Sequence, residues 1–255
     1  MRKILIESVI VFSVIAFSSF SANAAGDFLK APKQQWSFSG IFGTFDRGAL
    51  QRGFQVYSEV CAGCHSVRLL SYRNLLEIGF TEKQVKRIAA SKEVLDGPND
   101  DGEMFQRPGR LSDKFVKPFP NEQAARAGNN GALPPDLSLI TKARKNGTNY
   151  LHALLTGYKP VPKGMKVAEG MYYNPYYPGQ QIAMPPPLVD GGVEYTDKTK
   201  STITQMSSDL TTFLAWAAEP ELEARKRLGV KVLLFLLILT GLLYGIKRKV
   251  WSRLH

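Results

Sequence analysis

The sequence predicts a mostly α-helical domain with long loops, followed by a single C-terminal transmembrane helix. Apolar residues recur at helical spacing within 50–61 and 210–217, whereas the stretch 158–188 is dense in Pro, Gly and Tyr and has no period. The run from Leu228 to Ile246 is apolar apart from Lys231, close to the roughly 20 residues that a spanning helix needs. With 255 residues and 44% hydrophobic content, the chain can bury one sizeable core and still carry an anchor.

The start of the chain has the pattern of a secretory signal peptide. A basic lead, Arg2-Lys3, precedes a mostly apolar stretch, and the small residues Ala22-Asn23-Ala24 offer a cleavage site. Glu7 weakens the apolar stretch, so an uncleaved anchor helix is the alternative. We expect a signal peptide at 1–24 and an exported domain at 25–224, on the periplasmic side of a bacterial inner membrane.

The first helix of the domain is predicted to follow Asp46, whose carboxylate suits an N-cap position. The apolar positions that come next share one helical face: Leu50, Phe54, Tyr57 and Cys61. Gly53 lies on the same face, where the missing side chain would let another helix approach closely.

Both cysteines of the chain lie in one motif, Cys61-Ala62-Gly63-Cys64-His65. Thiols three positions apart face the same side of a helical turn, so they can add across the two vinyl groups of one haem, and the histidine can bind the iron. A redox dithiol needs no histidine there, and a zinc site needs two more ligands at paired spacing. The motif therefore predicts a c-type cytochrome with one covalently bound haem c and His65 as an axial ligand.

The middle of the domain is predicted to hold a surface insertion and two short helices. Residues 96–131 are rich in Gly, Asn and charge. Their acidic cluster could dock a basic partner or could equally be a merely soluble loop, and it consists of Asp96, Asp100, Asp101 and Glu103. A short helix follows Leu137 and runs through Arg144, and another runs from Tyr150 to Thr156 and ends at Gly157.

The second iron ligand is expected from the loop 158–188, whose aromatic residues argue against disorder and predict that it wraps the haem. Met184 is followed by three prolines, which fix the backbone in an extended form and can press the thioether onto the iron. Such a ligand favours ferrous iron and raises the potential. His152 is the rival, but the leucines around it form the buried stripe of its segment, so we expect His152 to face solvent.

A second apolar helix is predicted to begin at Ser207-Ser208-Asp209, near the end of the domain. Its inward positions are Leu210, Phe213, Leu214 and Ala217. A helix before the haem motif that crosses one near the end of the domain is typical of class I cytochromes c. Two unrelated amphipathic helices would give the same pattern, and only their crossing would distinguish the two.

The anchor is assigned to 225–247 and a cytoplasmic tail to 248–255. Pro220 suits the first turn of a helix that runs from the domain into the bilayer without a flexible tether. Basic residues flank both ends of the apolar run, so the signal peptide decides that the domain lies outside. Residues 225–255 hold eight basic and no acidic residues and supply +8 of the net charge of +11, which indicates lipid headgroups and excludes nucleic acid.

Several strings, in one order, resemble the cytochrome c1 family, the haem subunits of ubiquinol–cytochrome c reductase, in its α-proteobacterial or mitochondrial form. They are CAGCHS at 61–66, NGALPPDLS at 130–138, YNPYYPGQ at 173–180, MPPP at 184–187 and WAAEPE at 216–221, followed by the anchor. The resemblance covers nearly all of residues 35–255.

The resemblance implies a role for each matching position. Cys61 and Cys64 would be the thioether attachment points, and His65 and Met184 the two axial ligands. Arg144 would pair with a haem propionate, since a buried negative charge needs a cationic donor; by itself it would read as part of a solvated helix face. The residues that would line the haem edge are Asn129, Ala132, Pro134, Pro135, Ile140, Tyr150, Leu154, Tyr177 and Pro187.

The resemblance also implies an electron-transfer subunit that is not an enzyme on its own. It would pass electrons from a Rieske iron–sulfur protein to cytochrome c, beside cytochrome b in a dimeric membrane complex. A free-standing membrane-anchored monohaem carrier is the alternative. A di-haem peroxidase would need a second haem motif, and a gas sensor would want an open iron face.

Overall fold

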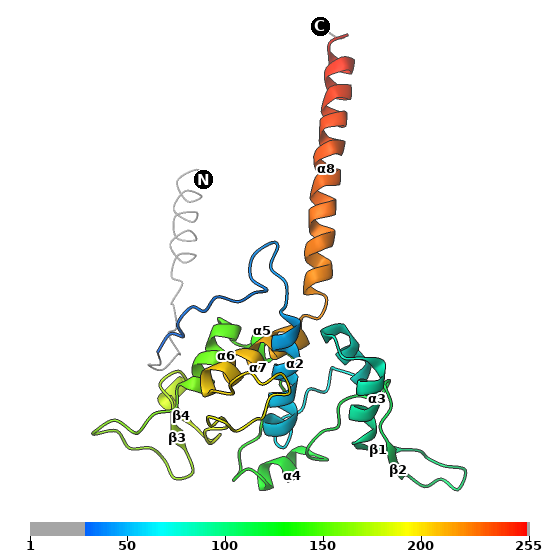
Figure 1. Cartoon of the computed structure of the whole chain (residues 1–255). Helices are drawn as coiled ribbons and strands as arrows, with labels where there is room; N and C mark the ends of the chain where they lie inside the picture. The colour runs from blue at the N-terminus through cyan, green and yellow to red at the C-terminus, as the bar shows by residue number, and fades with distance from the viewer. Residues whose placement is uncertain (1–28, 254–255) are drawn as a thin grey trace, which may run out of the picture.

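The computed structural model describes residues 29–253, in which one long helix projects from a mostly helical domain (Figure 1). The predicted signal peptide at 1–24 lies outside the described residues, as do 254–255. The α-helices are α2 (Arg47–Val56), α3 (Glu82–Ala90), α4 (Glu122–Ala127), α5 (Ile140–Ala143), α6 (Gly147–Thr156), α7 (Ile203–Ala218) and α8 (Leu222–Trp251). The predicted fold class, a mostly helical domain with one C-terminal helix able to cross a membrane, is confirmed.

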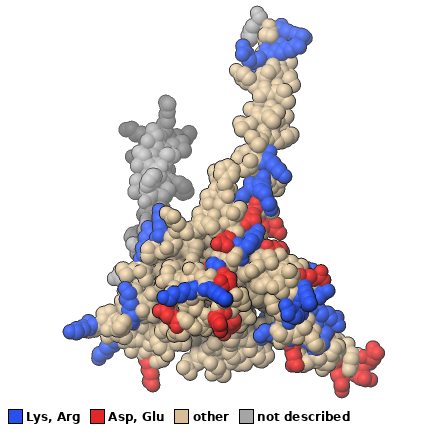
Figure 2. All heavy atoms as spheres, viewed as in Figure 1, with Lys and Arg blue, Asp and Glu red and all other residues tan. Residues whose placement is uncertain are grey.

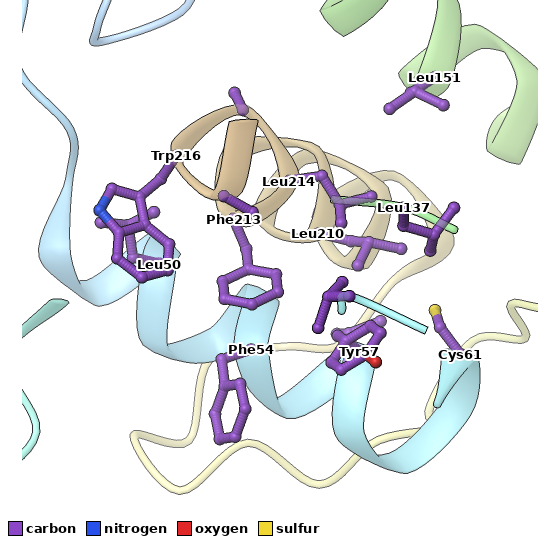
Figure 3. Packing of buried hydrophobic residues seen from close by; sticks show 14 of the residues in the cluster. Leu50, Phe54, Tyr57, Cys61, Leu137, Leu151, Leu210, Phe213, Leu214 and Trp216 are labelled. Carbon is purple, nitrogen blue, oxygen red and sulfur yellow. The ribbon is translucent and has the colours of Figure 1, made fainter. Parts of the chain in front are cut away.

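Helix α2 begins as predicted because Asp46 caps it. Its carboxylate accepts hydrogen bonds from the backbone N–H groups of Gly48 (2.8 Å) and Ala49 (3.2 Å), which have no partner inside the helix. The apolar face of α2 then turns toward α7, as the row of labelled side chains in Figure 3 shows. This helix therefore positions the haem motif that follows it.

Helices α2 and α7 cross at Gly53 and form the centre of the core. A Cβ atom at Gly53 would lie 2.1 Å from the carbonyl oxygen of Asp209, so the approach depends on glycine. The rings of Phe54 and Phe213 meet edge-on across the crossing, with centroids 5.8 Å apart. Since the two helices do cross, the class I cytochrome c arrangement is confirmed.

Replacing Gly53 by alanine should destabilise the domain by about 3 kcal/mol, because the added methyl group overlaps the α7 backbone. Denaturant unfolding of the detergent-solubilised protein, followed by far-UV circular dichroism, measures the change. Gly48→Ala is the matched control on the same helix, where the new Cβ meets only side-chain atoms, of Arg52 and Asp46, at 3.3 Å. It should change the stability by less than about 1 kcal/mol. If both variants lowered the free energy of unfolding equally, the close approach of α7 to Gly53 would be contradicted.

Arg52 adds ion pairs to the same crossing. Its guanidinium donates from Nε and Nη2 to the two carboxylate oxygens of Asp209, at 2.9 and 3.0 Å, and from Nη1 to Asp197, at 2.8 Å. Because Asp209 is buried, loss of Arg52 would leave a carboxylate without its cation. The ion pair between Arg52 and Asp209 fixes the rotation of α2 against α7.

Helix α7 begins four residues earlier than predicted, at Ile203 in place of Ser207. Thr202 is the N-cap, and its hydroxyl accepts from the backbone N–H of Gln205 (3.2 Å). Ser207 is buried inside the helix, where its hydroxyl donates to the carbonyl oxygen of His152 (3.3 Å). Ser207, where the helix was predicted to begin, thus joins α7 to α6.

The shorter helices also differ from the predicted bounds. The helix expected through Arg144 ends at Ala143, because Arg144 has extended backbone angles. Helix α6 begins at Gly147, three residues before the predicted Tyr150. Its end before Gly157 is as predicted.

Helix α8 starts at Leu222, so Pro220 precedes the helix and does not lie in its first turn. A short turn after Ala218 separates α8 from α7. The helix includes the assigned anchor 225–247 and continues to Trp251. Figure 2 shows basic side chains at both ends of α8 with uncharged surface between them, the pattern of a membrane span.

The predicted surface insertion at 96–131 is only partly a surface feature. It contributes β2 (Phe105–Pro108), which pairs antiparallel with β1 (Glu93–Asp96), and the charged turn between them projects from the domain (Figure 1). Phe115, however, is buried, and its ring lies 4.6 Å from that of Tyr72. The segment is therefore attached to the core by an aromatic side chain that composition did not reveal.

An ion pair in this segment predicts acid sensitivity. Arg107 donates to both carboxylate oxygens of Asp113, at 2.7 and 3.0 Å, and lowers the pKa of Asp113 to about 2. A carboxyl group whose pKa is lower in the folded state stabilises the fold above its unfolded pKa of about 4, and this contribution is lost as the pH falls toward 2. Asp113→Asn should therefore lower the thermal midpoint at pH 7 and have little effect near pH 2.

Thermal unfolding, followed by circular dichroism from pH 7 to pH 2, measures how far the midpoint of Asp113→Asn lies below that of the wild type at each pH. Asp100→Asn, in the exposed turn between β1 and β2, is the control, and its thermal midpoint should follow that of the wild type at every pH. If the midpoints of Asp113→Asn and the wild type differed by the same amount from pH 7 to pH 2, the stabilisation would not depend on the ionised carboxylate of Asp113.

Candidate haem-binding site

A π-helical turn, Tyr57–Cys61, continues α2, and its last residue is the first cysteine of the haem motif. Such turns insert one extra residue into a helix and are frequent at functional sites. The chain then folds back tightly, because the backbone N–H groups of Cys64 and His65 both donate to the carbonyl oxygen of Cys61, at 3.1 and 2.8 Å. The turn places the two thiols and the imidazole at one end of α2.

The two thiols differ in their surroundings. Cys61 is buried at the end of the α2 row in Figure 3, whereas Cys64 is exposed, and neither forms a disulfide. Burial, with a smaller effect of Cys64, raises the pKa of the Cys61 thiol to about 12. Cys61 is therefore a neutral thiol at physiological pH, and both sulfurs are free to form a bond.

His65 is held in one orientation by a backbone carbonyl. Its Nδ1 lies 2.8 Å from the carbonyl oxygen of Pro135, and because that oxygen only accepts, Nδ1 carries the proton. Burial lowers the pKa of His65, so the ring is neutral. The lone pair of Nε2 is thus available to a metal, and the bond from Nδ1 to Pro135 is of the kind that metal-binding histidines usually make through their other ring nitrogen.

Asp136 fastens the segment after the motif to the segment of Pro135. Its carboxylate accepts from the hydroxyl of Ser66 (2.7 Å) and from the backbone N–H groups of Arg68 and Ser138 (both 3.0 Å). The backbone of Leu137 donates to the carbonyl oxygen of Ser66 (2.8 Å). These bonds fix the carbonyl oxygen that orients His65.

Sequence reasoning assigned no role to Asp136, although the string that contains it was noted. The available signal was local: an aspartate two residues before a serine is typical of a side-chain turn onto the backbone N–H. That turn is present at Ser138. The bond to Ser66 joins residues 70 apart and had no local signal.

Three of the predicted lining residues are buried in the same apolar cluster as Cys61: Ile140, Tyr150 and Leu154. Asn174 donates from Nδ2 to the carbonyl oxygen of Leu154 (2.8 Å) and accepts at its own carbonyl oxygen from the backbone N–H of Tyr177 (3.1 Å). Tyr177 is partly buried against the cluster. The loop 158–188 is therefore bonded to α6 at the site, as its predicted role requires.

Met184 is half-buried and packs against the same cluster. The hydroxyl of Tyr158 donates to the carbonyl oxygen of Met184 (3.0 Å), and burial raises the pKa of Tyr158. Sequence reasoning attributed the support of Met184 to the three prolines and missed Tyr158. The tyrosine fixes the backbone at Met184 from 26 residues away.

Arg144 lies at the exposed rim of the site. Its charge acts on Tyr150, where it opposes the larger effect of burial, which raises the pKa of that tyrosine. Nη1 donates to the carbonyl oxygen of Ala143 (3.2 Å), and the guanidinium also forms a side-chain hydrogen bond with Tyr150. The placement suits a propionate partner.

The remaining five predicted lining residues are not members of the apolar cluster. Asn129 and Ala132 are in the turn after α4, where Asn129 donates from Nδ2 to the carbonyl oxygen of Ala125 (2.7 Å). Pro134 and Pro187 are half-buried, and Pro135 is exposed. In residues 29–253, the apolar cluster contains none of these five side chains.

The prediction that His152 faces solvent is wrong. His152 is only 9% exposed, and its ring meets the edge of Trp36 at a centroid distance of 6.1 Å. The N-terminal segment covers the face of α6 that the periodicity assigned to solvent. Burial lowers the pKa of His152, and a hydrogen bond to the backbone of Thr204 opposes this effect, so His152 is a core residue between α6 and α7.

The donor set fits a haem. A neutral imidazole with a free Nε2, two unpaired thiols three residues apart and a thioether on an anchored loop are the groups that such a cofactor takes. Within the part of the chain that the structure describes, no three His, Cys, Asp or Glu side chains gather as a metal-ion site requires.

Together, the crossed helices, this donor set and the apolar C-terminal helix are the features of a haem protein of the cytochrome class with one helix long enough to cross a membrane. A profile described as "Cytochrome C1 family" matches residues 36–254. The chain therefore belongs to the cytochrome c1 family, as the resemblance indicated.

Relatives of known name agree with this assignment. The protein named "Cytochrome c1 1, heme protein, mitochondrial" from Arabidopsis thaliana is 52% identical over 95% of this chain and 79% of its own length. "Cytochrome c1" from Rhodospirillum rubrum is 49% identical over 86% of each chain. "Cytochrome b/c1" from Bradyrhizobium diazoefficiens is 51% identical over 92% of this chain, which spans 37% of that longer protein.

Proposed function

We propose that this chain holds one haem c, covalently bound through Cys61 and Cys64, with His65 and Met184 as axial ligands. The observation that carries the proposal is the hydrogen bond from His65 Nδ1 to Pro135, which leaves Nε2 free beside two free thiols. A haem bound there supplies a one-electron ferric–ferrous couple.

The chain's own residues position the ligands and limit access by water. Pro135 orients the imidazole, Asp136 holds Pro135 in place, and Tyr158 fixes the backbone of Met184. Ligands that are held in place in both oxidation states keep the rearrangement on electron transfer small. The buried side chains of Tyr150 and Leu154 supply an apolar wall.

We further propose that the chain is the electron-transfer subunit of a respiratory ubiquinol–cytochrome c reductase. It would accept electrons from a Rieske iron–sulfur protein and pass them to cytochrome c, beside cytochrome b in a dimeric complex. Family membership supports this role, and the Bradyrhizobium relative carries both cytochromes in its name. The chain itself makes and breaks no substrate bonds, so it is a redox subunit and not an enzyme alone.

The same proposal places the haem domain on the periplasmic side of a bacterial inner membrane. Helix α8 is long and apolar enough to cross the bilayer once, and the predicted signal peptide would export the domain. In the acidic cluster, Asp96 forms an ion pair with Arg107 within the hairpin. Asp100, Asp101 and Glu103 are exposed and would be the carboxylates left to steer a basic cytochrome c.

Purification of the full chain from its native membranes, with a haem stain, tests the proposal. We expect a haem-stained band of this chain, accompanied by a b-type cytochrome and an iron–sulfur protein. Recovery of the stained chain without those two partners would favour a free-standing carrier. A chain of the correct mass that carries no haem would contradict the proposed cofactor itself.

A further inference from the structure

The loop 37–44 presents two large apolar side chains to the outside. Phe42 is 84% exposed and Ile41 is 70% exposed, and Leu237 of α8 is also 70% exposed. The sequence from 38 to 45 carries no charged residue. Adjacent apolar side chains this exposed are unfavourable in water, so their position on the molecule decides what covers them.

The loop has a defined shape. The backbone N–H of Thr44 donates to the carbonyl oxygen of Ser37 (3.1 Å), which closes its base. Gly40 has a positive φ of 74°, and a Cβ at Gly43 would lie 2.0 Å from the carbonyl oxygen of Ser39. Both glycines are needed for this tight turn, and the turn carries Ile41 and Phe42 at its tip.

The base of the loop is attached to the first turns of α8. Lys226 donates from Nζ to the carbonyl oxygens of Phe38 (2.6 Å) and Gly43 (2.9 Å), one on each arm of the loop. Glu223 accepts from the backbone N–H of Phe45 (2.7 Å). The loop therefore stands beside the foot of α8, on the side from which the helix leaves the domain (Figure 1).

The tip reaches the level at which the membrane span begins. The apolar run starts at Leu228, two residues beyond Lys226 and about 3 Å further along the helix axis. The arms between the base and the tip are short: Ser39 and Gly40 separate Phe38 from Ile41 and can extend about 7 Å, and Phe42 directly precedes Gly43. Arg225 and Arg227 mark the headgroup level beside it.

We propose that Ile41 and Phe42 insert into the bilayer interface and form a second membrane contact beside α8. A domain attached by one helix can rotate about the helix axis, whereas a second contact to the side limits that rotation. The loop would thereby fix the direction in which the haem domain faces above the membrane. This inference goes beyond the proposed function and requires only that α8 spans the bilayer.

Photocrosslinking in native membranes tests the proposal and identifies what covers the tip. Benzoylphenylalanine is incorporated in place of Phe42 in the full chain and, separately, in place of Ile41 in case the first variant folds poorly. Leu95, a 59% exposed residue of the distant β-hairpin, is the matched control position. Mass spectrometry of the irradiated chain then separates lipid adducts from protein adducts.

We expect lipid adducts at position 42 or 41 in severalfold higher yield than at position 95. Adducts to another protein would show that a partner or a second copy of this chain covers the tip, and would overturn the bilayer assignment. A yield of lipid adducts equal to that at position 95 would show that the tip faces water and would overturn it as well.

Discussion

The double variant Cys61→Ala, Cys64→Ala should lose all haem that survives denaturing electrophoresis. Both sulfurs are free, and they lie at one end of α2 beside an imidazole held by Pro135, which is why we propose them as the attachment points. Without a thioether bond, a haem held only by axial ligands separates from the denatured chain. Haem staining of the gel and the intact mass of the chain measure the loss.

The single variants serve as controls for folding. Cys61→Ala and Cys64→Ala should each keep one thioether bond and stay stained, with the α band of the reduced spectrum at longer wavelength because one vinyl group remains conjugated. A double variant that retained covalent haem would contradict the assignment. So would a wild-type chain whose mass showed no added macrocycle.

Local signals predicted the helices that carry the site. The cap at Asp46, the glycine at the crossing and the apolar face that ends at Cys61 all lie in α2 and the π-helical turn that continues it, where spacing alone determines the neighbours. The crossing itself needed the structure, because two amphipathic helices that never meet have the same pattern. Its geometry at Gly53 removes that ambiguity.

The prediction for His152 failed because burial on that face is a tertiary effect. Periodicity within α6 assigned this histidine to the outer side, and no neighbour along the helix contradicts that reading. Trp36, more than a hundred residues earlier, packs on the ring, and α7 bonds to the backbone at the same residue through Ser207. The same contact explains why Ser207, where the helix was predicted to begin, lies inside α7.

The haem motif was readable from sequence because its chemistry lies in five consecutive residues. The groups that hold it in place were not readable, because each acts across a long separation. Asp136 bonds to Ser66 and Tyr158 bonds to Met184, and neither pair has a spacing that a helix or turn would produce. Sequence therefore predicts which groups could bind the cofactor, and the structure adds the residues that orient them.

Replacing Met184 by leucine should remove the proposed second axial ligand and leave the fold intact. Leucine has nearly the volume of methionine, so the packing against the core and the bond from Tyr158 to the backbone at 184 should persist. The thioether sulfur is lost, and with it the stabilisation of ferrous iron. We expect the midpoint potential to fall by on the order of hundreds of millivolts, within the span of about 0.8 V that axial ligands cover.

Redox titration and the reduced absorption spectrum measure the change, and carbon monoxide binding reports whether the iron face has opened. Met165→Leu, at a half-buried position of the same loop, is the matched control and should keep the wild-type spectrum. A Met184→Leu spectrum identical to wild type, with no rapid carbon monoxide binding, would contradict the ligand. His152→Gln tests the rival ligand, because it would change the spectrum if the imidazole of His152 bound the iron. Since His152 packs against Trp36, we expect this variant to keep the wild-type spectrum.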